Sequence, residues 1–286
     1  MLDTATTTSR DAATWLQGPV AIVGANGHVG TSVQARVTSI SNDVRPLGRH
    51  DGLAVALGDA DAVIHLAGTL QATGGNTYEE ANVETVRRTI AALAGSSVKR
   101  VVFLSYVGAD PRSPNAYLRT KGEAEQLLLG CGLEVVVLRS TFIFGPPDSP
   151  GPSATPFVSK DSKPVSVIGS GQQRYAPVYV EDVSAALLRC ALDTAVQAGT
   201  YALAGPDIFS VDEFADTLSG RDVKERHLGP RLARALAHVV PSLTPAMVDV
   251  LAADSLPEAG LPLAADALGL DFHHLTTVYA QSTVTA

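Results

Sequence analysis

The feature that most constrains this chain is a run of glycines between an apolar segment and an amphipathic one. Residues 19–24, PVAIVG, predict a buried strand, and residues 29–39 have the pattern of a helix. Gly24, Gly27 and Gly30 follow the strand at a three-residue spacing. In such a loop the first glycine makes the tight turn, the second lets the backbone approach a pyrophosphate, and the third allows close packing of helix on sheet. Free N–H groups at the helix start also favour an anion. An ordinary strand-to-helix turn is the alternative, but the order strand, loop, helix favours nucleotide binding.

Further along, apolar segments alternate with segments of helical periodicity. Strands are predicted over residues 43–49, 61–68, 98–105 and 133–145, and helices over residues 78–95 and from Pro114 onward. Near-continuous apolar strands separated by amphipathic helices are typical of a parallel sheet covered on both faces. The predicted fold class is therefore α/β, a doubly wound Rossmann sheet.

After Gly145 the pattern changes to a Pro-, Gly- and Ser-rich loop followed by short mixed elements. Capping residues are predicted at Asp182 for one helix, at Ser210 with Glu213 as a capping box for the next, and as first-turn prolines at Pro230 and Pro245. We expect a flexible N-terminal tail over residues 1–17, a Rossmann domain over residues 18–145, and a smaller mixed substrate lobe over residues 146–286. Some elements of that lobe should return to the main sheet.

The second predicted strand is expected at the edge of the sheet. Only eleven residues separate Arg49 from Asp61, too few for the crossover helix and extra strand that usually follow at this point of a Rossmann fold. Pro46 lies inside the strand, and proline is tolerated in edge strands because it has no N–H to donate.

Composition excludes several classes of protein. The chain has 286 residues, 45% of them apolar, and a net charge of −8, which argues against nucleic acid or an anionic membrane surface as partner. Its two cysteines have no metal-type spacing, and the adjacent His273 and His274 cannot both face one metal, so no metal site is expected. The N-terminal segment lacks the apolar core of a signal peptide, and no apolar run approaches 18 residues. These features predict a soluble, cytoplasmic protein that is a monomer or homodimer.

Three side chains form a candidate proton-transfer group. Ser105 ends a predicted strand, so its hydroxyl should lie at the carboxyl edge of the sheet, where ligands bind in such folds. Tyr117 follows in the first turn of a helix that Ser113 and Pro114 are expected to start, and Lys121 stands one turn later. An ammonium beside a phenol stabilises the phenolate and lowers its pKa. Each residue alone has an ordinary structural explanation, and the nucleotide loop favours the catalytic one.

The charged residues at the end of the edge strand predict which cofactor is bound. NAD-binding proteins usually place a carboxylate there for the ribose 2′-hydroxyl, whereas this chain has Arg49, with Arg45 on the same strand face. Arginine pairs with a 2′-phosphate in a bidentate manner, so NADPH is predicted and NAD is the less favoured cofactor. The alternative is an edge-strand charge that opposes aggregation.

Several motifs together resemble the extended or atypical short-chain dehydrogenases/reductases, which include relatives of NAD-dependent epimerases and dehydratases. They are GANGHVG, DAVIHLAG, ANVETVRRTIAAL, YLRTK and VLRSTFIFGP, and they run from about residue 18 to residue 205. The resemblance is closest to the atypical branch that includes isoflavone-reductase-like enzymes and a respiratory complex I accessory subunit.

The resemblance implies roles for individual residues. It places Asn82, Ser105, Tyr117 and Lys121 on the family's catalytic tetrad, with Asn82 holding a water that relays protons; a helix-start cap is the alternative for Asn82. It implies cofactor contacts from Gly24, Asn26, Gly27, His28, Val29, Gly30, Arg49, Leu66, Ala67 and Gly68. Arg174 falls where sugar-nucleotide-using relatives contact a phosphate, and a surface arginine is its alternative.

The expected function is an NADPH-dependent oxidoreductase that reduces a carbonyl or enone in a small molecule. Two alternatives are a nucleotide-sensing or assembly protein without catalysis, and a nucleotide-sugar epimerase or dehydratase that recycles a tightly held NAD.

Overall fold

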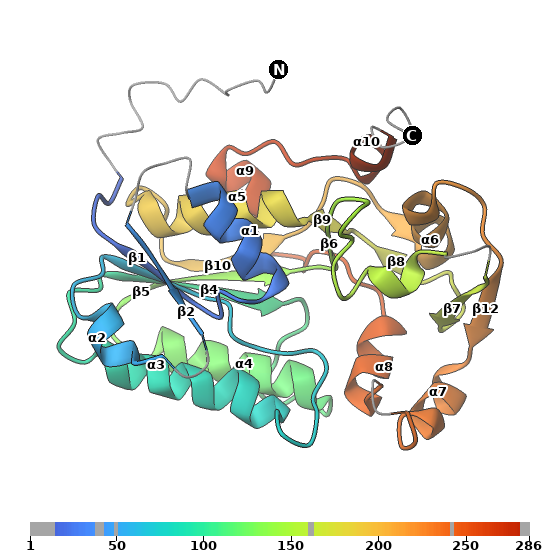
Figure 1. The fold of residues 1–286 in the computed structure, drawn as a ribbon, viewed down its shortest axis with the longest axis horizontal. Coiled ribbons are helices and arrows are strands. Elements are labelled where there is room, and N and C mark those ends of the chain that lie inside the picture. The colour runs from blue at the N-terminus through green and yellow to red at the C-terminus, as the bar shows by residue number, and fades with distance from the viewer. Residues whose placement is uncertain (1–14, 38–42, 49–50, 160–162, 241–242, 281–286) are drawn as a thin grey trace.

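A six-stranded parallel sheet forms the centre of the molecule (Figure 1). The computed structural model describes residues 15–37, 43–48, 51–159, 163–240 and 243–280. The strand order is β10-β5-β4-β3-β1-β2. Their bounds are β1 Val20–Val23, β2 Val44–Leu47, β3 Ala62–His65, β4 Arg100–Tyr106, β5 Glu134–Ser140 and β10 Gly199–Leu203. The α/β fold class predicted from the strand pattern is confirmed.

Helices cover both faces of this sheet. Two of them, α1 (His28–Val37) and α5 (Val180–Leu192), pack on one face, and α3 (Thr85–Leu93) and α4 (Ala116–Leu129) cover the other (Figure 1). Successive residues of the central strands therefore enter different cores: Ile22 and Val102 pack toward α1 and α5, whereas Val101 and Phe103 pack beneath α3 and α4. Because both faces are buried, the strands need no polar positions, which explains their continuous apolar sequences.

The edge position of β2 agrees with its proline. Pro46 lies beside Ile22 in β1, and among the described strands β2 pairs with β1 alone. The short connection to β3 holds only a five-residue helix, α2 (Leu53–Leu57), and no strand among its described residues. The described residues therefore lack the strand that usually follows β2 through a crossover helix in a Rossmann fold, as the short chain between Arg49 and Asp61 predicts.

The C-terminal part combines a small lobe with elements that return to the sheet. The lobe holds strand pairs β7 (Val165–Ile168) with β12 (Glu225–Leu228), β8 (Arg174–Tyr175) with β11 (Phe209–Ser210), and β6 (Ile143–Phe144) with β9 (Val178–Tyr179). Its helices are α6 (Val211–Ser219), α7 (Pro230–Leu236), α8 (Pro245–Leu251), α9 (Ala264–Leu268), α10 (Leu275–Ala280), and a 3-10 turn over Thr155–Phe157. A cluster of aromatic rings, including Phe142, Tyr175 and Phe214, forms its core. Strand β10 and helix α5 instead belong to the main sheet layer.

Some predicted helix caps are present and others are wrong. Ser210 and Glu213 form the capping box, and Pro230 and Pro245 stand in first turns. Asp182 does not cap α5, because Tyr179 occupies that position; its carboxylate instead accepts hydrogen bonds from the backbone and ring of His273.

The N-terminal region predicted as a tail lies outside the described residues up to position 14. Leu16 donates its backbone N–H to the Leu192 carbonyl, so the end of that region contacts α5. In the described part of the chain, none of the helices has the length and apolarity needed to cross a membrane.

Candidate functional site

The glycine loop has the close backbone approach that its spacing predicts. Gly24 has a positive φ of 90°, and a Cβ atom there would lie 2.6 Å from the Ala67 nitrogen. At Gly30 a Cβ would lie 2.5 Å from the Ala25 carbonyl oxygen, whereas at Gly27 the nearest atom would be 3.4 Å away. Gly24 and Gly30 are therefore needed for the turn and for the packing of α1. At Gly27 there is room, and the absence of a side chain serves an incoming ligand.

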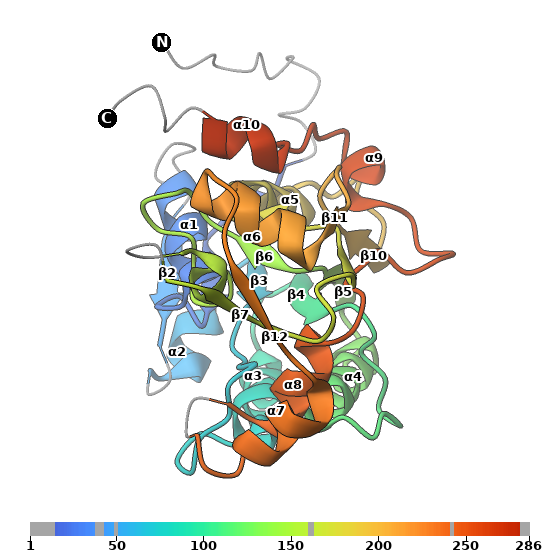
Figure 2. The same ribbon diagram turned by 90° about the vertical axis from the view of Figure 1, so that its right-hand side faces the viewer.

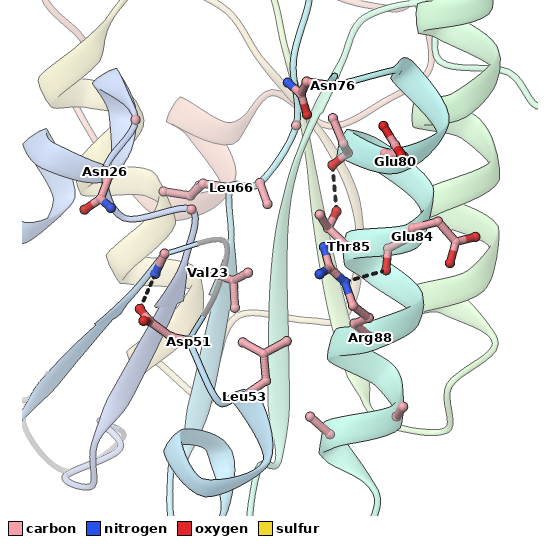
Figure 3. Close-up of a pocket in the computed structure, with 18 of the residues that line it drawn as sticks. Val23, Asn26, Asp51, Leu53, Leu66, Asn76, Glu80, Glu84, Thr85 and Arg88 are labelled. Atoms are coloured by element: carbon pink, nitrogen blue, oxygen red, sulfur yellow. Dashed lines mark hydrogen bonds between the residues drawn. The ribbon is translucent and has the colours of Figure 1, made fainter. Parts of the chain in front are cut away.

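A cavity of about 1080 Å³ opens at this loop (Figure 3). Its walls come from the ends of β1, β2 and β3, from α2, and from the helical segment that begins at Glu79. Predicted cofactor residues in its lining are Gly24, Asn26, Gly27, Leu66, Ala67 and Gly68. The volume and the glycine cradle fit a nicotinamide dinucleotide. The rest of the lining mixes small and apolar residues with the charged side chains of Asp51, Glu80, Glu84 and Arg88.

Three other predicted cofactor residues lie behind the loop. Gly30 is buried in α1, and Val29 packs against the two cores beside that helix. The His28 ring fits between two glycines of the following loop, since a Cβ at Gly151 would lie 2.6 Å from its Nε2 atom and one at Gly145 would lie 3.1 Å from its Cε1 atom. His28 thus joins the phosphate loop to the start of the C-terminal lobe.

Charged side chains lie at and near the end of β2. Arg49 lies outside the described residues. The Arg45 guanidinium pairs with Asp59 and Asp43, and its expected contribution to a phosphate site stays a prediction. The Asp51 carboxylate accepts a 2.6 Å hydrogen bond from the Gly48 N–H at the end of β2.

Sequence reasoning missed Asp51 and Arg88, which line opposite walls of the cavity in Figure 3. Arg88 lies on α3, where its Nε donates weakly, at 3.4 Å, to the Glu84 carbonyl oxygen. Its neighbour Arg87 instead pairs with the Glu84 carboxylate. The position of Arg88 on the helix that carries Asn82 was available in the sequence, but its orientation toward the cavity was not.

The catalytic candidates Ser105, Tyr117 and Lys121 lie at the end of β4 and in the first turns of α4. Asn115, and not Ser113, is the N-cap of α4, and its side-chain oxygen accepts from the N–H groups of Tyr117 and Leu118. The Lys121 ammonium donates a 2.7 Å hydrogen bond to the Leu104 carbonyl oxygen. Ser105 is 3% exposed, and its hydroxyl is buried without a hydrogen-bond partner among the described residues.

Burial dominates the titration of this pair. Desolvation raises the pKa of Tyr117 well above its usual value, with smaller contributions from Tyr106 and Tyr78. Desolvation likewise lowers the pKa of Lys121 to about 8. The expectation that Lys121 lowers the pKa of Tyr117 is wrong for this structure, because the ammonium is directed to a backbone carbonyl and lies 4.4 Å from the centre of the Phe103 ring.

Aromatic rings and helix α8 enclose Tyr117. Its ring centroid is 5.6 Å from that of Tyr106 and 6.0 Å from that of Tyr78, and Ala246 and Val250 of α8 belong to the same apolar cluster. Both ribbon views place α8 beside α4 (Figures 1 and 2). The Asn115 amide fixes this contact by donating to the Ala246 carbonyl oxygen at 3.0 Å.

Asn82 lies within a π-helical turn over Glu79–Glu84. Its side-chain oxygen accepts from the Thr69 N–H, and its amide donates to the Thr120 hydroxyl, which is part of YLRTK. Asn82 therefore joins the loop after β3 to helix α4. It is not the cap of its own helical segment, because Tyr78 holds that position. The water relay implied for Asn82 stays a prediction.

His65, His273, His274 and Arg174 each have identifiable neighbours in the structure. His65 is fully buried beside Phe103 and Lys121, and desolvation lowers its pKa to about 3, so the ring is neutral. His273 and His274 pair with different aspartates, Asp182 and Asp207. In the part of the chain that the structure describes, no cluster of side chains could hold a metal ion. Arg174 pairs with Asp254 at 2.9 Å.

A parallel sheet with a glycine cradle at its carboxyl edge and a tyrosine–lysine helix beside it defines a dinucleotide-binding Rossmann protein of the short-chain dehydrogenase/reductase type. The chain belongs to the NAD dependent epimerase/dehydratase family, whose model matches residues 20–204. Binding of NAD or NADP follows from this membership and from the fit of the cavity.

Curated relatives include mitochondrial proteins of respiratory complex I. NADH dehydrogenase [ubiquinone] 1 alpha subcomplex subunit 9 of Arabidopsis thaliana is 31% identical over 170 residues, which cover 59% of this chain and 42% of that protein. The NADH-ubiquinone oxidoreductase 40 kDa subunit of Neurospora crassa is 27% identical over 58% of this chain and 43% of its own length. The chain thus matches less than half the length of these relatives.

Solved structures share the fold across nearly the whole chain. Human epimerase family protein SDR39U1 with NADPH has a TM-score of 0.72 at 18% identity, covering 94% of this chain and all of that one. MoeE5 in complex with UDP-glucose and NAD has a TM-score of 0.70 at 21% identity, also over 94% of this chain and all of the other. At these identities the likeness establishes the fold alone.

Proposed function

We propose that this protein is an NADPH-dependent reductase of a carbonyl or enone group in a small organic molecule. As expected from the sequence, it would act in the cytoplasm as a monomer or homodimer. The observation that carries the proposal is the buried Ser105 hydroxyl, which has no hydrogen-bond partner in the described part of the chain. Ser105 is next to Tyr106, whose ring contacts that of Tyr117. A buried polar group without a partner is costly, so it indicates a ligand atom that completes the site.

In the proposed reaction a carbonyl group is reduced to an alcohol by transfer of a hydride and a proton. A nicotinamide held in the cavity would supply the hydride for the new C–H bond at the carbonyl carbon, and NADPH would be oxidised to NADP⁺. Ser105 donates a hydrogen bond to the carbonyl oxygen and stabilises the charge that develops there. Tyr117 transfers its hydroxyl proton to that oxygen, giving the alcohol, and later regains a proton from solvent.

Lys121 acts on the phenolate left by that transfer. In the structure described here its ammonium is bound to the Leu104 carbonyl oxygen. The ribose hydroxyls of a bound cofactor would give the ammonium a second hydrogen-bond acceptor. The positive charge of Lys121 would stabilise the Tyr117 phenolate, which forms only during turnover.

The observations on the choice between NADPH and NAD point in both directions. Arg49 in the sequence and Arg88 in the lining favour an additional phosphate, and the human relative with a similar fold is named with NADPH. Asp51 at the end of β2 favours a ribose 2′-hydroxyl, and hence NAD, since a carboxylate accepts from a hydroxyl and repels a phosphate. Titration of the protein with NADPH and NADH decides between the two.

Each alternative function has an observation of its own. The named complex I relatives favour an assembly role in which the nucleotide is bound without turnover. The structures named with UDP-sugars favour an epimerase, but Arg174, the candidate phosphate ligand for such a substrate, is paired with Asp254.

The test compares Tyr117→Phe with Tyr106→Phe. Loss of the Tyr117 hydroxyl should reduce the turnover number at least about a thousandfold, because the proton donor is removed, while the dissociation constant for NADPH changes by less than about twofold. Tyr106 is a matched control: it contacts the same ring, but its hydroxyl bonds to Ser255. Equal turnover in wild type and Tyr117→Phe would refute the assignment of Tyr117. Tight NADPH binding without oxidation by any carbonyl compound would favour the assembly role.

A further inference from the structure

Glu125, Arg139 and Glu258 form an ion-pair chain between helix α4 and the C-terminal lobe. The Arg139 guanidinium at the end of β5 donates through Nε and Nη2 to the two carboxylate oxygens of Glu125, at 3.1 and 2.6 Å. Its Nη1 atom donates to the Glu258 carboxylate at 2.6 Å. Glu258 lies between α8 and α9, and its other oxygen accepts from the Gly108 N–H in the loop after β4. Segments far apart in sequence therefore meet at one arginine.

The ion-pair chain ends next to Lys121, because Glu125 follows this lysine by one turn of α4. Both side chains are buried, with Lys121 5% exposed and Glu125 4% exposed. Side chains four residues apart share one face of a helix, and salt screens buried charges only weakly. Burial lowers the pKa of Lys121 to about 8, and the Glu125 carboxylate opposes this fall.

Glu258 sets the net charge of the ion-pair chain. Glu125 and Arg139 alone are neutral together, so the guanidinium would cancel much of the attraction between Glu125 and the Lys121 ammonium. With Glu258 the three groups carry one net negative charge, and with Lys121 the four are neutral. Asp110 also acts on Arg139, but from the protein surface, where water screens its charge. Glu125 therefore keeps more of its effect on Lys121 when Glu258 is in place.

Neighbouring elements present neutral groups to Lys121. On β3 the His65 ring is uncharged, because burial lowers its pKa to about 3, with a smaller contribution from Lys121 itself. On β4 the centre of the Phe103 ring lies 4.4 Å from the ammonium. A Cβ atom placed at Gly68 would lie 2.7 Å from Asn82 Oδ1 and 3.5 Å from Lys121 Nζ, so the Asn82 amide is also close. These groups orient the ammonium, and the ion-pair chain supplies the negative charge.

We propose that Glu125 and Glu258 are positioning residues for Lys121: the C-terminal segment that carries Glu258 keeps the lysine protonated through Arg139 and Glu125. The lobe that covers Tyr117 with α8 thereby also controls the charge of the lysine one turn away. The effect on the charge of Lys121 follows from the ion-pair geometry. Its consequence for turnover rests on the proposed reductase function, in which the ammonium stabilises the phenolate.

The experiment measures the pKa of Lys121 by NMR titration of protein labelled with ¹³C at the lysine Cε atoms. The chain has five lysines, and Lys121→Met identifies the signal of Lys121. Glu125→Gln should lower the pKa of Lys121 by about 1, and Glu258→Gln should lower it by about 0.5, because each change removes a negative charge and leaves Arg139 less neutralised. The effect of Glu258→Gln is the smaller because Glu258 acts from farther along the ion-pair chain.

Glu123→Gln is the matched control. Glu123 lies on the same helix, two residues before Glu125, and pairs with Arg119 at the surface. It should change the pKa of Lys121 by less than about 0.2, because residues two apart do not share a helix face and surface charges are screened.

An unchanged or raised pKa of Lys121 in Glu258→Gln, or an equal fall in Glu123→Gln, would overturn the coupling. Glu258→Gln decides this even where Glu125→Gln fails to fold. In the reductase, the pH profile of turnover should shift downward in Glu258→Gln by the same amount as the pKa of Lys121, whereas a merely structural defect would lower turnover at every pH. If the pKa moves as expected but no carbonyl compound is reduced, the coupling stands and the reductase function fails.

Discussion

The nucleotide end and the catalytic end of the site are built in opposite ways. The nucleotide end is an open cavity of about 1080 Å³ lined largely by backbone, glycines and small side chains from the first 92 residues. The catalytic end is closed, aromatic and completed by α8, more than 120 residues beyond Tyr117 in sequence. Local geometry alone can form the first, whereas the second depends on how the C-terminal lobe packs against α4.

This contrast separates what the two ends can recognise. A cradle of N–H groups with space above Gly27 binds any pyrophosphate of the right shape. An enclosure of Tyr78, Tyr106 and α8 around Tyr117 discriminates by size and charge, because each ligand atom must replace a protein contact or remain unsatisfied. If the proposed function is correct, we therefore expect the C-terminal lobe to select the substrate.

Among the variants that test the contrast between the two ends, we expect the largest effect on cofactor affinity at Gly27. Gly27→Ala should weaken NADPH and NADH binding equally, by roughly a hundredfold, since hydrogen bonds to a charged pyrophosphate are lost. The fold should persist, because the added Cβ would lie 3.4 Å from its nearest neighbour, the Gly24 carbonyl oxygen. Calorimetric titration measures the affinities, and Gly52→Ala, where a Cβ would have no neighbour within 4 Å, is the control. Unchanged affinity in Gly27→Ala would mean that the cofactor does not lie on this loop.

At the catalytic end, Lys121→Met should stabilise the protein while reducing turnover. Burial lowers the pKa of Lys121 to about 8 in the folded state, whereas its ordinary value is 10.5. Below pH 8 the buried charge is present and destabilises the folded state by up to about 3 kcal/mol. Between pH 8 and about 10.5 the unfolded chain binds more protons than the folded one, so the free energy of unfolding of the wild type rises with pH.

Urea unfolding at pH 7 and pH 9.5 tests this linkage. Lys121→Met should be the more stable protein at pH 7, and its advantage should shrink at pH 9.5, where the wild-type lysine has lost its proton. A variant that is less stable than wild type at pH 7 would show that the hydrogen bond to the Leu104 carbonyl and the contact with Phe103 outweigh desolvation.

The smallest effect is expected at Arg45. Arg45→Gln should leave the ratio of NADPH to NADH affinity within about twofold of the wild type, because this side chain is engaged by Asp59 and Asp43 at the protein surface. Arg49→Gln is the informative partner and should lower that ratio about tenfold if Arg49 binds the 2′-phosphate. A tenfold loss of NADPH preference in Arg45→Gln would show that the Asp59 pair opens when the cofactor binds.

Sequence patterns sufficed where an element is defined by near neighbours along the chain. The spacing of Gly24, Gly27 and Gly30 predicted the β1–α1 turn, and the short link before Asp61 together with Pro46 predicted the edge strand. Cap positions were less predictable. Asn115 rather than Ser113 caps α4, and Asp182 pairs with His273, because polar side chains near a helix start can choose among several partners.

The sequence by itself determined the fold class, the phosphate loop and the placement of Ser105, Tyr117 and Lys121 near one sheet edge, because strand and helix periodicities fix these over short distances. Only the tertiary structure decided their environment. It buried Tyr117 beneath α8, directed Lys121 to the Leu104 carbonyl, and left the Ser105 hydroxyl without a partner among the described residues. Desolvation and long-range packing set these features, and neither is encoded in any local run of residues.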